Sequence, residues 1–224
     1  IVSIQAIGQG TITSIMAECS NNTQLRGIVR GDYQSIGDNE NFKTLLGSAT
    51  LAITIEPEGR ERYQGLVPMD KDSLSECLEY YFDQSEQLST KIKLTADQHT
   101  AAGVLIQEMP HSSNDEQARE NWQHLSVLLE SLKPEEQLKL EHEEQLYRLF
   151  HEQKVRLFEP EKLQFFCSCS KARTAKMLVS LGADEVNQII QEQGLIDVNC
   201  EFCDQHYQFD QSDIDEIFNQ PSVH

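Results

Sequence analysis

The sequence of 224 residues lacks the patterns that define several large protein classes. No run approaches the roughly 20 apolar residues of a membrane-spanning helix, so we expect no membrane partner. A phosphate-binding Gly-x-x-x-x-Gly-Lys motif is missing, as are Gly-x-Gly-x-x-Gly and Gly-x-Ser-x-Gly, and nothing in the sequence argues for an enzyme. We expect no signal peptide, and the first residues, Ile1-Val2-Ser3-Ile4, read as the middle of a strand. An N-terminal segment is therefore expected to be missing.

Basic residues are also scarce, because 18 lysines and arginines stand against 37 acidic residues and give a net charge of −19. A protein this acidic is repelled by phosphate backbones, so we expect no nucleic-acid partner. The six cysteines have metal-type spacing, which indicates a reducing compartment and a cytoplasmic location.

Four of the six cysteines form two close pairs, Cys167-Ser168-Cys169 and Cys200-Glu201-Phe202-Cys203, separated by residues 170–199. Two such pairs around a foldable insert are typical of a four-thiolate zinc site. We therefore predict one Zn²⁺ bound by Cys167, Cys169, Cys200 and Cys203. Two unrelated groups of buried thiols are one alternative, and replacement of one ligand by His206 is another. Four thiolates leave no open coordination position, so metal-assisted hydrolysis is not expected.

The composition divides the chain into three predicted regions of an α+β protein. Residues 1–110 contain alternating strand patterns, such as Leu51–Glu56, and one amphipathic helix that a capping box of Ser73 and Glu76 begins and that extends to about Leu88, so they predict a sheet-rich core domain with packed helices. Cys77 lies on the apolar face of this helix and is expected to be a core residue.

Residues 111–166 are rich in Glu, Gln and Leu and predict a marginally packed helical linker, in which Ser113 could cap the first helix. Val155–Phe158, within the same segment, predicts a short strand. Residues 167–224 predict a small C-terminal four-cysteine zinc domain whose folding depends on the metal. Ser170 and Ser212 are expected to cap the first and last helices of this domain.

The residues alone leave two functions open for the cysteine cluster. The zinc could be purely structural, in a constitutive protein-interaction module. Alternatively, oxidation of the thiolates would consume the ligands and expel the zinc, which would make the module a redox switch. A thiol–disulfide oxidoreductase is disfavoured, because no Cys-x-x-Cys opens a helix in a βαβ unit.

The cysteine pattern and several other motifs together resemble the heat-shock protein 33 family of redox-regulated holdase chaperones. The shared motifs are Leu25-Arg26-Gly27, Arg62-Tyr63-Gln64-Gly65, Cys77-Leu78-Glu79-Tyr80-Tyr81-Phe82, Ser85-Glu86-Gln87-Leu88, the two cysteine pairs and His206-Tyr207. The resemblance covers essentially the whole chain, apart from a helical N-terminal segment that the family carries and this chain lacks.

The resemblance implies a function that the composition does not show. It assigns the four cysteines as zinc ligands of a reduced, inactive chaperone, and it implies Cys167–Cys169 and Cys200–Cys203 disulfides after oxidation. Zinc release and unfolding of residues 111–166 would then expose apolar surface. Unfolding client proteins would bind that surface without ATP, and the active form would be a homodimer.

Overall fold

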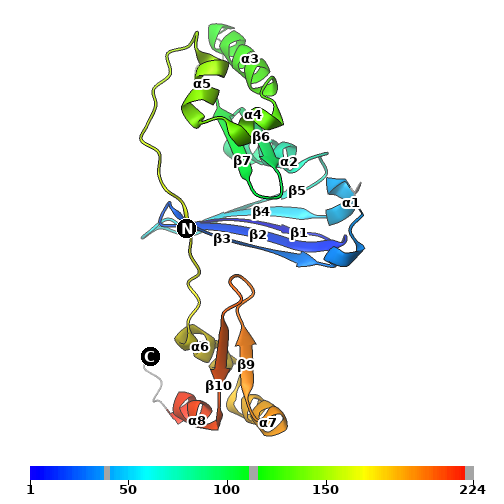
Figure 1. The fold of residues 1–224 in the computed structure, drawn as a ribbon, viewed down its shortest axis with the longest axis vertical. Helices are drawn as coiled ribbons and strands as arrows, with labels where there is room; N and C mark the ends of the chain where they lie inside the picture. The colour runs from blue at the N-terminus through cyan, green and yellow to red at the C-terminus, as the bar shows by residue number, and fades with distance from the viewer. Residues whose placement is uncertain (38–40, 111–115, 220–224) are drawn as a thin grey trace. The chain divides into compact units, whose positions relative to one another are not determined.

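The computed structural model of the protein describes residues 1–37, 41–110 and 116–219. Its contacts divide the chain into two compact units. Unit 1 contains Ile1–Glu18 and Val29–Lys162, and unit 2 contains Cys19–Ile28 and the chain from Leu163 onward. Both helices and sheets are present, so the predicted α+β class is confirmed (Figure 1). Within the described ranges, no helix is both long enough and apolar enough to cross a membrane.

Six strands form one sheet in the order β5-β4-β1-β2-β3-β8. Their bounds are β1 (Val2–Ile7), β2 (Ile12–Ser20), β3 (Gln24–Gly31), β4 (Thr50–Ile55), β5 (Tyr63–Pro68) and β8 (Gln164–Phe165). The pairs β1–β4 and β4–β5 are antiparallel, whereas β8 pairs with β3 in parallel. The boundary between the units crosses the β2–β3 hairpin, since the tip of this hairpin belongs to unit 2.

The core of unit 1 lies between this sheet and helix α2 (Leu74–Tyr81). Ser73 and Glu76 form the predicted capping box, in which each side chain accepts a hydrogen bond from the backbone of the other residue. The buried side chains of this core are Ala6, Leu46, Leu51, Ile53, Val67, Met69, Cys77, Leu78 and Tyr81. Cys77 is fully buried, which confirms the prediction that it is a core residue.

The packing of Tyr81 explains why the Arg62-Tyr63-Gln64-Gly65 motif ends in glycine. A Cβ atom at Gly65 would lie 2.5 Å from Cε2 of Tyr81, whose side chain is buried. Only glycine therefore lets β5 pass this close to the ring. The predicted helix to about Leu88 ends earlier, because α2 gives way to a π-helical turn (Phe82–Glu86) and Gln87 adopts a left-handed conformation.

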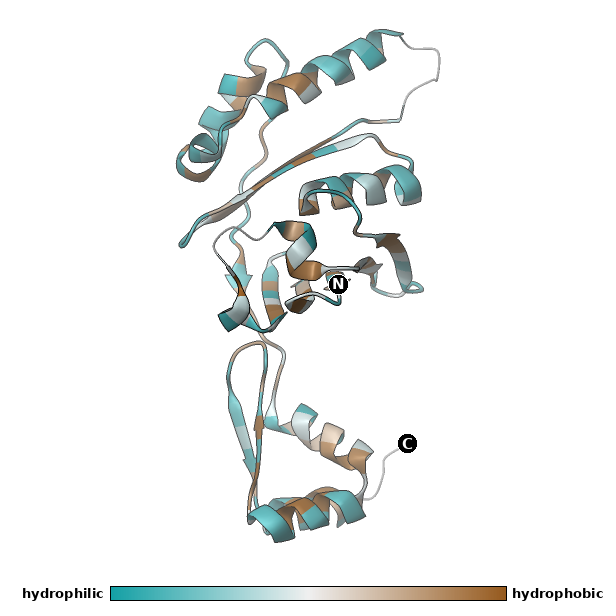
Figure 2. Cartoon of the chain, turned by 90° about the vertical axis from the view of Figure 1, so that its right-hand side faces the viewer, coloured by the Kyte–Doolittle hydropathy of each residue, from teal (hydrophilic) through white to brown (hydrophobic). Residues whose placement is uncertain are grey.

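A second part of unit 1 consists of the hairpin β6 (Thr90–Ala96) and β7 (Ala101–Gln107) with helices α3 (Glu116–Glu130), α4 (Pro134–Lys139) and α5 (His142–Phe150). The helices bury Leu129, Leu132, Leu149 and Phe150, and Val104 and Ile106 of β7 pack against this group. Figure 2 shows hydrophilic and hydrophobic residues alternating along these helices, as expected for amphipathic packing. The predicted cap Ser113 lies outside the described residues. Unit 1 also contains helix α1 (Phe42–Leu46) and a short 3-10 helix (Tyr33–Ser35).

A strand predicted at Val155–Phe158 is wrong. The segment 154–163 has no regular secondary structure, and the short strand β8 follows it instead. The side chains of Val155, Leu157 and Phe158 are 45%, 49% and 76% exposed, so they do not form the buried face of a sheet. Pro160 in the same segment also lacks the N–H that a sheet ladder needs.

Unit 2 packs three helices against a hairpin. The elements are α6 (Lys171–Leu181), α7 (Ala183–Gln193), β9 (Ile196–Asn199), β10 (His206–Phe209) and α8 (Gln211–Asn219). The buried side chains are Leu178, Val186, Ile190, Ile196, Phe209 and Ile214. Ser170 caps α6 as predicted, but Ser212 does not cap α8. Asp210 has that role, because its Oδ1 accepts a hydrogen bond of 2.9 Å from the Asp213 amide.

Candidate metal centre

Two short loops carry the four cysteines of the candidate metal centre. The Cys167-Ser168-Cys169 loop leads directly into α6, whose first turn is fixed by a hydrogen bond of 3.2 Å from the Arg173 amide to Ser170 Oγ. The second loop connects β9 to β10. Its turn is closed by hydrogen bonds from the Cys203 and Asp204 amides to the Cys200 carbonyl, at 3.3 and 2.8 Å. Asp204 adopts a left-handed conformation (φ 59°), which brings Cys200 and Cys203 to the same end of the hairpin.

The four sulfur atoms converge on one point. All of them lie within 4.8 Å of one another. The closest contacts run between the loops, with 3.7 Å from Cys167 Sγ to Cys200 Sγ and 3.4 Å from Cys169 Sγ to Cys203 Sγ. These distances are too long for disulfides, and all six cysteines of the chain are free. The four cysteines singled out from the sequence are thus brought together, and each is half-buried.

This geometry fits a tetrahedral metal site. Sulfur atoms about 2.3 Å from a central zinc ion would lie about 3.8 Å from one another, which is close to the separations between the loops. Four soft thiolate donors are the set preferred by zinc and by iron–sulfur centres. The four side chains could therefore hold a metal ion.

Hydrogen bonds among the thiols separate their proton affinities. Burial alone would raise the pKa of Cys167, but hydrogen bonds from the Cys169 backbone and from the other three thiols outweigh it and lower the pKa to about 7. At Cys203 a backbone hydrogen bond at Gln205 favours the thiolate, whereas shared hydrogen bonds with Cys169 and the other thiols, together with burial, raise the pKa to about 12. The cluster releases its first proton easily and retains its last. A metal cation at the centre would favour the deprotonated form of all four cysteines, because it binds thiolates.

Tyr207 is also a member of the site, although in the sequence it is notable only as part of the His206-Tyr207 motif. Its hydroxyl donates a hydrogen bond of 3.1 Å to Cys169 Sγ. That bond to the sulfur raises the pKa of Tyr207 to about 12, so the hydroxyl remains a donor at neutral pH. Its neighbour His206 takes no part in the cluster, since its Nδ1 atom lies 3.0 Å from Asp197 Oδ1.

The two remaining cysteines stand apart from this centre. Burial raises the pKa of Cys77 in the unit 1 core, which keeps this thiol protonated and unreactive. Cys19 lies on β2 and is half-buried. Neither belongs to the group of converging ligands.

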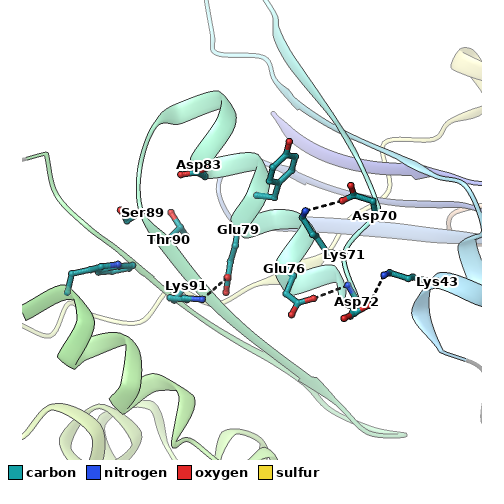
Figure 3. A pocket seen from close by; sticks show the side chains of 12 residues that line it. Lys43, Asp70, Lys71, Asp72, Glu76, Glu79, Asp83, Ser89, Thr90 and Lys91 are labelled. Carbon is teal, nitrogen blue, oxygen red and sulfur yellow. Dashed lines mark hydrogen bonds and ion pairs between the residues drawn. The ribbon is translucent and has the colours of Figure 1, made fainter. Parts of the chain in front are cut away.

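A polar cavity of about 560 Å³ in unit 1 is a second candidate for a functional site (Figure 3). Its charged groups already have partners: Lys43 pairs with Asp72 at 2.7 Å, and Lys91 pairs with Glu79 at 3.1 Å. Glu76 accepts hydrogen bonds from the start of α2. The carboxylates named here therefore have a structural role, and the four-cysteine cluster remains the candidate site.

The chain is an α+β protein with four converging thiols near its C-terminus, and proteins of this class have cysteines that could hold a metal ion. The sequence matches the family model of the Hsp33 protein over residues 1–210. The chain therefore belongs to the Hsp33 family, which is a family of chaperones.

Individual relatives agree with this assignment. The chain is 42% identical to the 33 kDa chaperonin of Hahella chejuensis, and the match covers 99% of this chain and 78% of the relative. It is 42% identical to the 33 kDa chaperonin of Pseudomonas aeruginosa strain PAO1, with 97% and 74% of the two chains covered. The crystal structure of the 33 kDa chaperonin (heat shock protein 33 homologue) of Thermotoga maritima has the same fold, with a TM-score of 0.81 over 96% of this chain and 76% of that chain, at 21% identity.

Proposed function

We propose that the protein is a redox-regulated, ATP-independent holdase chaperone that is inactive when reduced and zinc-bound. The observation that carries this proposal is the set of four free thiols within 4.8 Å of one another, in a chain of the Hsp33 family. Cys167, Cys169, Cys200 and Cys203 would hold one Zn²⁺ in the reduced form. When bound, zinc would keep the four sulfurs as thiolates and hold the two loops together.

Oxidation removes the ligands in pairs. Two thiols and one molecule of peroxide give one disulfide and two molecules of water, so two peroxides convert all four cysteines. We propose the pairs Cys167–Cys169 and Cys200–Cys203. The shortest sulfur distances run between the loops, so peptide mapping of the oxidised protein must decide the pairing. Either pairing leaves no thiolate for a metal, and the two loops lose the restraint that joins them.

The proposed consequence is unfolding of the linker, residues 111–166. Two observations support this step. In the described part of this region, four large apolar side chains are buried in the cluster of the helices, which makes the helices a small cooperative unit. The extended segment before β8 already exposes Leu157, Phe158 and Leu163. Clients would be unfolding proteins with exposed apolar segments, and the active form would be a homodimer in a reducing, cytoplasmic compartment.

A constitutive, zinc-stabilised interaction module is the second candidate. It is favoured by the core of unit 2, where six buried side chains pack α6, α7 and α8 on the hairpin. Such a core requires no switching. This candidate predicts that loss of zinc abolishes activity.

One experiment separates the two candidates. A single preparation is divided, and one half is kept reduced with zinc while the other is treated with peroxide at heat-shock temperature. Released zinc, free thiols and suppression of the aggregation of a thermally unfolding client are measured in parallel. The holdase predicts that about four thiols disappear as zinc is released, and that protection of the client appears only then. Retained zinc, or activity in the reduced half alone, would refute it.

A further inference from the structure

Arg26 of strand β3 contacts both cysteine loops of unit 2. Its Nη1 atom donates a hydrogen bond of 3.1 Å to Ser168 Oγ, the hydroxyl between Cys167 and Cys169. The guanidinium carbon lies 4.5 Å from the ring centre of Phe202, which stands between Cys200 and Cys203. A single planar cation therefore bridges the middle residues of the two ligand-bearing loops.

The same end of β3 is joined to the chain that leads into the first loop. The Gln164 amide donates to the Thr23 carbonyl at 2.9 Å, and the Phe166 amide donates to the Leu25 carbonyl at 3.0 Å. Strand β8 has only two residues, so these bonds alone form a weak attachment. Arg26 directly follows Leu25 and extends this attachment to Ser168.

Ser168 is held from a second direction. Arg173 Nη1 donates to Ser168 Oγ at 2.6 Å and to its carbonyl at 3.0 Å. The hydroxyl accepts from two guanidinium groups at once, which fixes the orientation of the loop between Cys167 and Cys169. A disulfide across this loop would change its backbone and displace the hydroxyl from both arginines.

From these contacts we propose that Arg26 is a positioning residue that couples the state of the cysteine centre to strand β3. Arg26 can reach Ser168 and Phe202 together only while the two loops converge. Loss of convergence breaks both contacts and leaves β8 attached to β3 by its backbone bonds alone. The signal then passes along β3, which continues beyond unit 2 as far as Gly31 in unit 1. This inference rests on the proposed metal-binding function and adds the residue that transmits it.

The test uses the full chain at saturating zinc, with bound zinc measured per chain. Hydrogen exchange of the Gln164 and Phe166 amides is measured by NMR in the wild type, Arg26→Gln, Arg26→Lys and Arg30→Gln. Arg30 lies on the same strand face four residues further along and outside unit 2, so it controls for the loss of one charge. We expect exchange of the two amides to be about tenfold faster in Arg26→Gln with zinc still bound, and unchanged in Arg30→Gln. Arg26→Lys should resemble Arg26→Gln, because an ammonium group cannot stack on Phe202 and reach Ser168 in the same planar geometry.

A second arm shows whether Arg26 acts through Ser168. Ser168→Ala should accelerate the same two exchanges in the wild type and add little in the Arg26→Gln background. Wild-type exchange rates in Arg26→Gln, or full rescue by Arg26→Lys, would overturn the coupling while leaving metal binding intact. A wild type that binds no zinc would overturn the proposed function itself, and the coupling with it.

Discussion

The core of unit 1 and the cysteine-bearing loops of unit 2 differ in the interactions that stabilise each of them. In unit 1, helix α2 closes on the sheet through side chains such as Leu51, Cys77 and Tyr81, which are almost completely buried. Unit 2 also has a buried core, but its four cysteines lie outside that core and are only half-buried. Apolar packing does not depend on redox state, whereas a thiolate cluster does. Under the proposed function, oxidation would therefore disrupt the cysteine centre of unit 2 and leave the packed core of unit 1 intact.

Of the changes considered, removal of one proposed zinc ligand should have the largest effect on the difference between the two regions. Cys167→Ser or Cys200→Ser leaves three thiolates, and since structural zinc supplies about 10–16 kcal/mol of binding free energy, we expect zinc affinity to fall by several orders of magnitude. Amides in residues 163–170 and 196–206 should lose exchange protection. Those of the unit 1 core should not.

Cys19→Ser is the matched control, because Cys19 belongs to unit 2 but not to the converging group. Competition with a chromogenic chelator measures the affinity of all three variants. Wild-type zinc affinity in both Cys167→Ser and Cys200→Ser would disprove the ligand assignment.

Gly65→Ala should destabilise unit 1 and leave the four-cysteine cluster unchanged. The new Cβ would lie 2.5 Å from Cε2 of Tyr81, whose side chain is only 1% exposed, so the ring or β5 would have to shift. We expect a loss of about 3 kcal/mol in the free energy of unfolding of unit 1, with zinc affinity unchanged. Denaturant unfolding followed by aromatic fluorescence or circular dichroism gives the value. Adding Tyr81→Leu removes the clash, so the double variant should lose less than the sum of the two single changes.

Gln137→Ala tests whether the helices of residues 116–150 can be loosened from the β6–β7 hairpin without loss of the metal. The Gln137 side chain is 3% exposed, donates to the Lys93 carbonyl at 2.7 Å and accepts from Thr95 Oγ1 at 2.6 Å. Truncation leaves both β6 groups without this partner, which should cost about 2 kcal/mol. We expect faster exchange in α4 and α5 and some client protection in the reduced, zinc-bound protein.

Gln117→Ala provides the comparison for that change, because Gln117 is exposed and its hydrogen bond to Asn121 lies on the surface of α3. It should leave both exchange and client protection as in the wild type. A Gln137→Ala protein that remains inactive until oxidised, despite loosened helices, would show that release of these helices is not sufficient for chaperone activity.

The sequence predicts local features well where one residue determines them. The capping box of Ser73 and Glu76 and the Ser170 cap follow from short spacings, and the convergence of the four cysteines follows from two close pairs of a kind typical of metal sites. The predicted strand at Val155–Phe158 fails because a strand needs a partner, and no local pattern states whether one exists. Arg26 was seen only as part of a motif, since its contact with Ser168 spans 142 positions in the sequence. Such contacts depend on the tertiary fold.

The smallest predicted effect concerns the turn between β6 and β7, where unit 1 uses charge instead of apolar packing. Asp97 Oδ1 accepts hydrogen bonds from the His99 and Thr100 amides at 2.8 and 2.7 Å, and these bonds lower the pKa of its carboxyl group. A lowered pKa in the folded state means that the stabilisation is present above the unfolded pKa of about 4 and is lost as pH falls through the lower folded value. Asp97→Asn cannot titrate, so the difference in thermal midpoint between wild type and variant should shrink as the pH is lowered from 6 to 3. Asp83→Asn, which removes the same charge on the exposed π-helical turn, should not reproduce this trend. A constant difference across the pH range would mean that the turn is held by its backbone conformation and that the carboxylate contributes nothing to it.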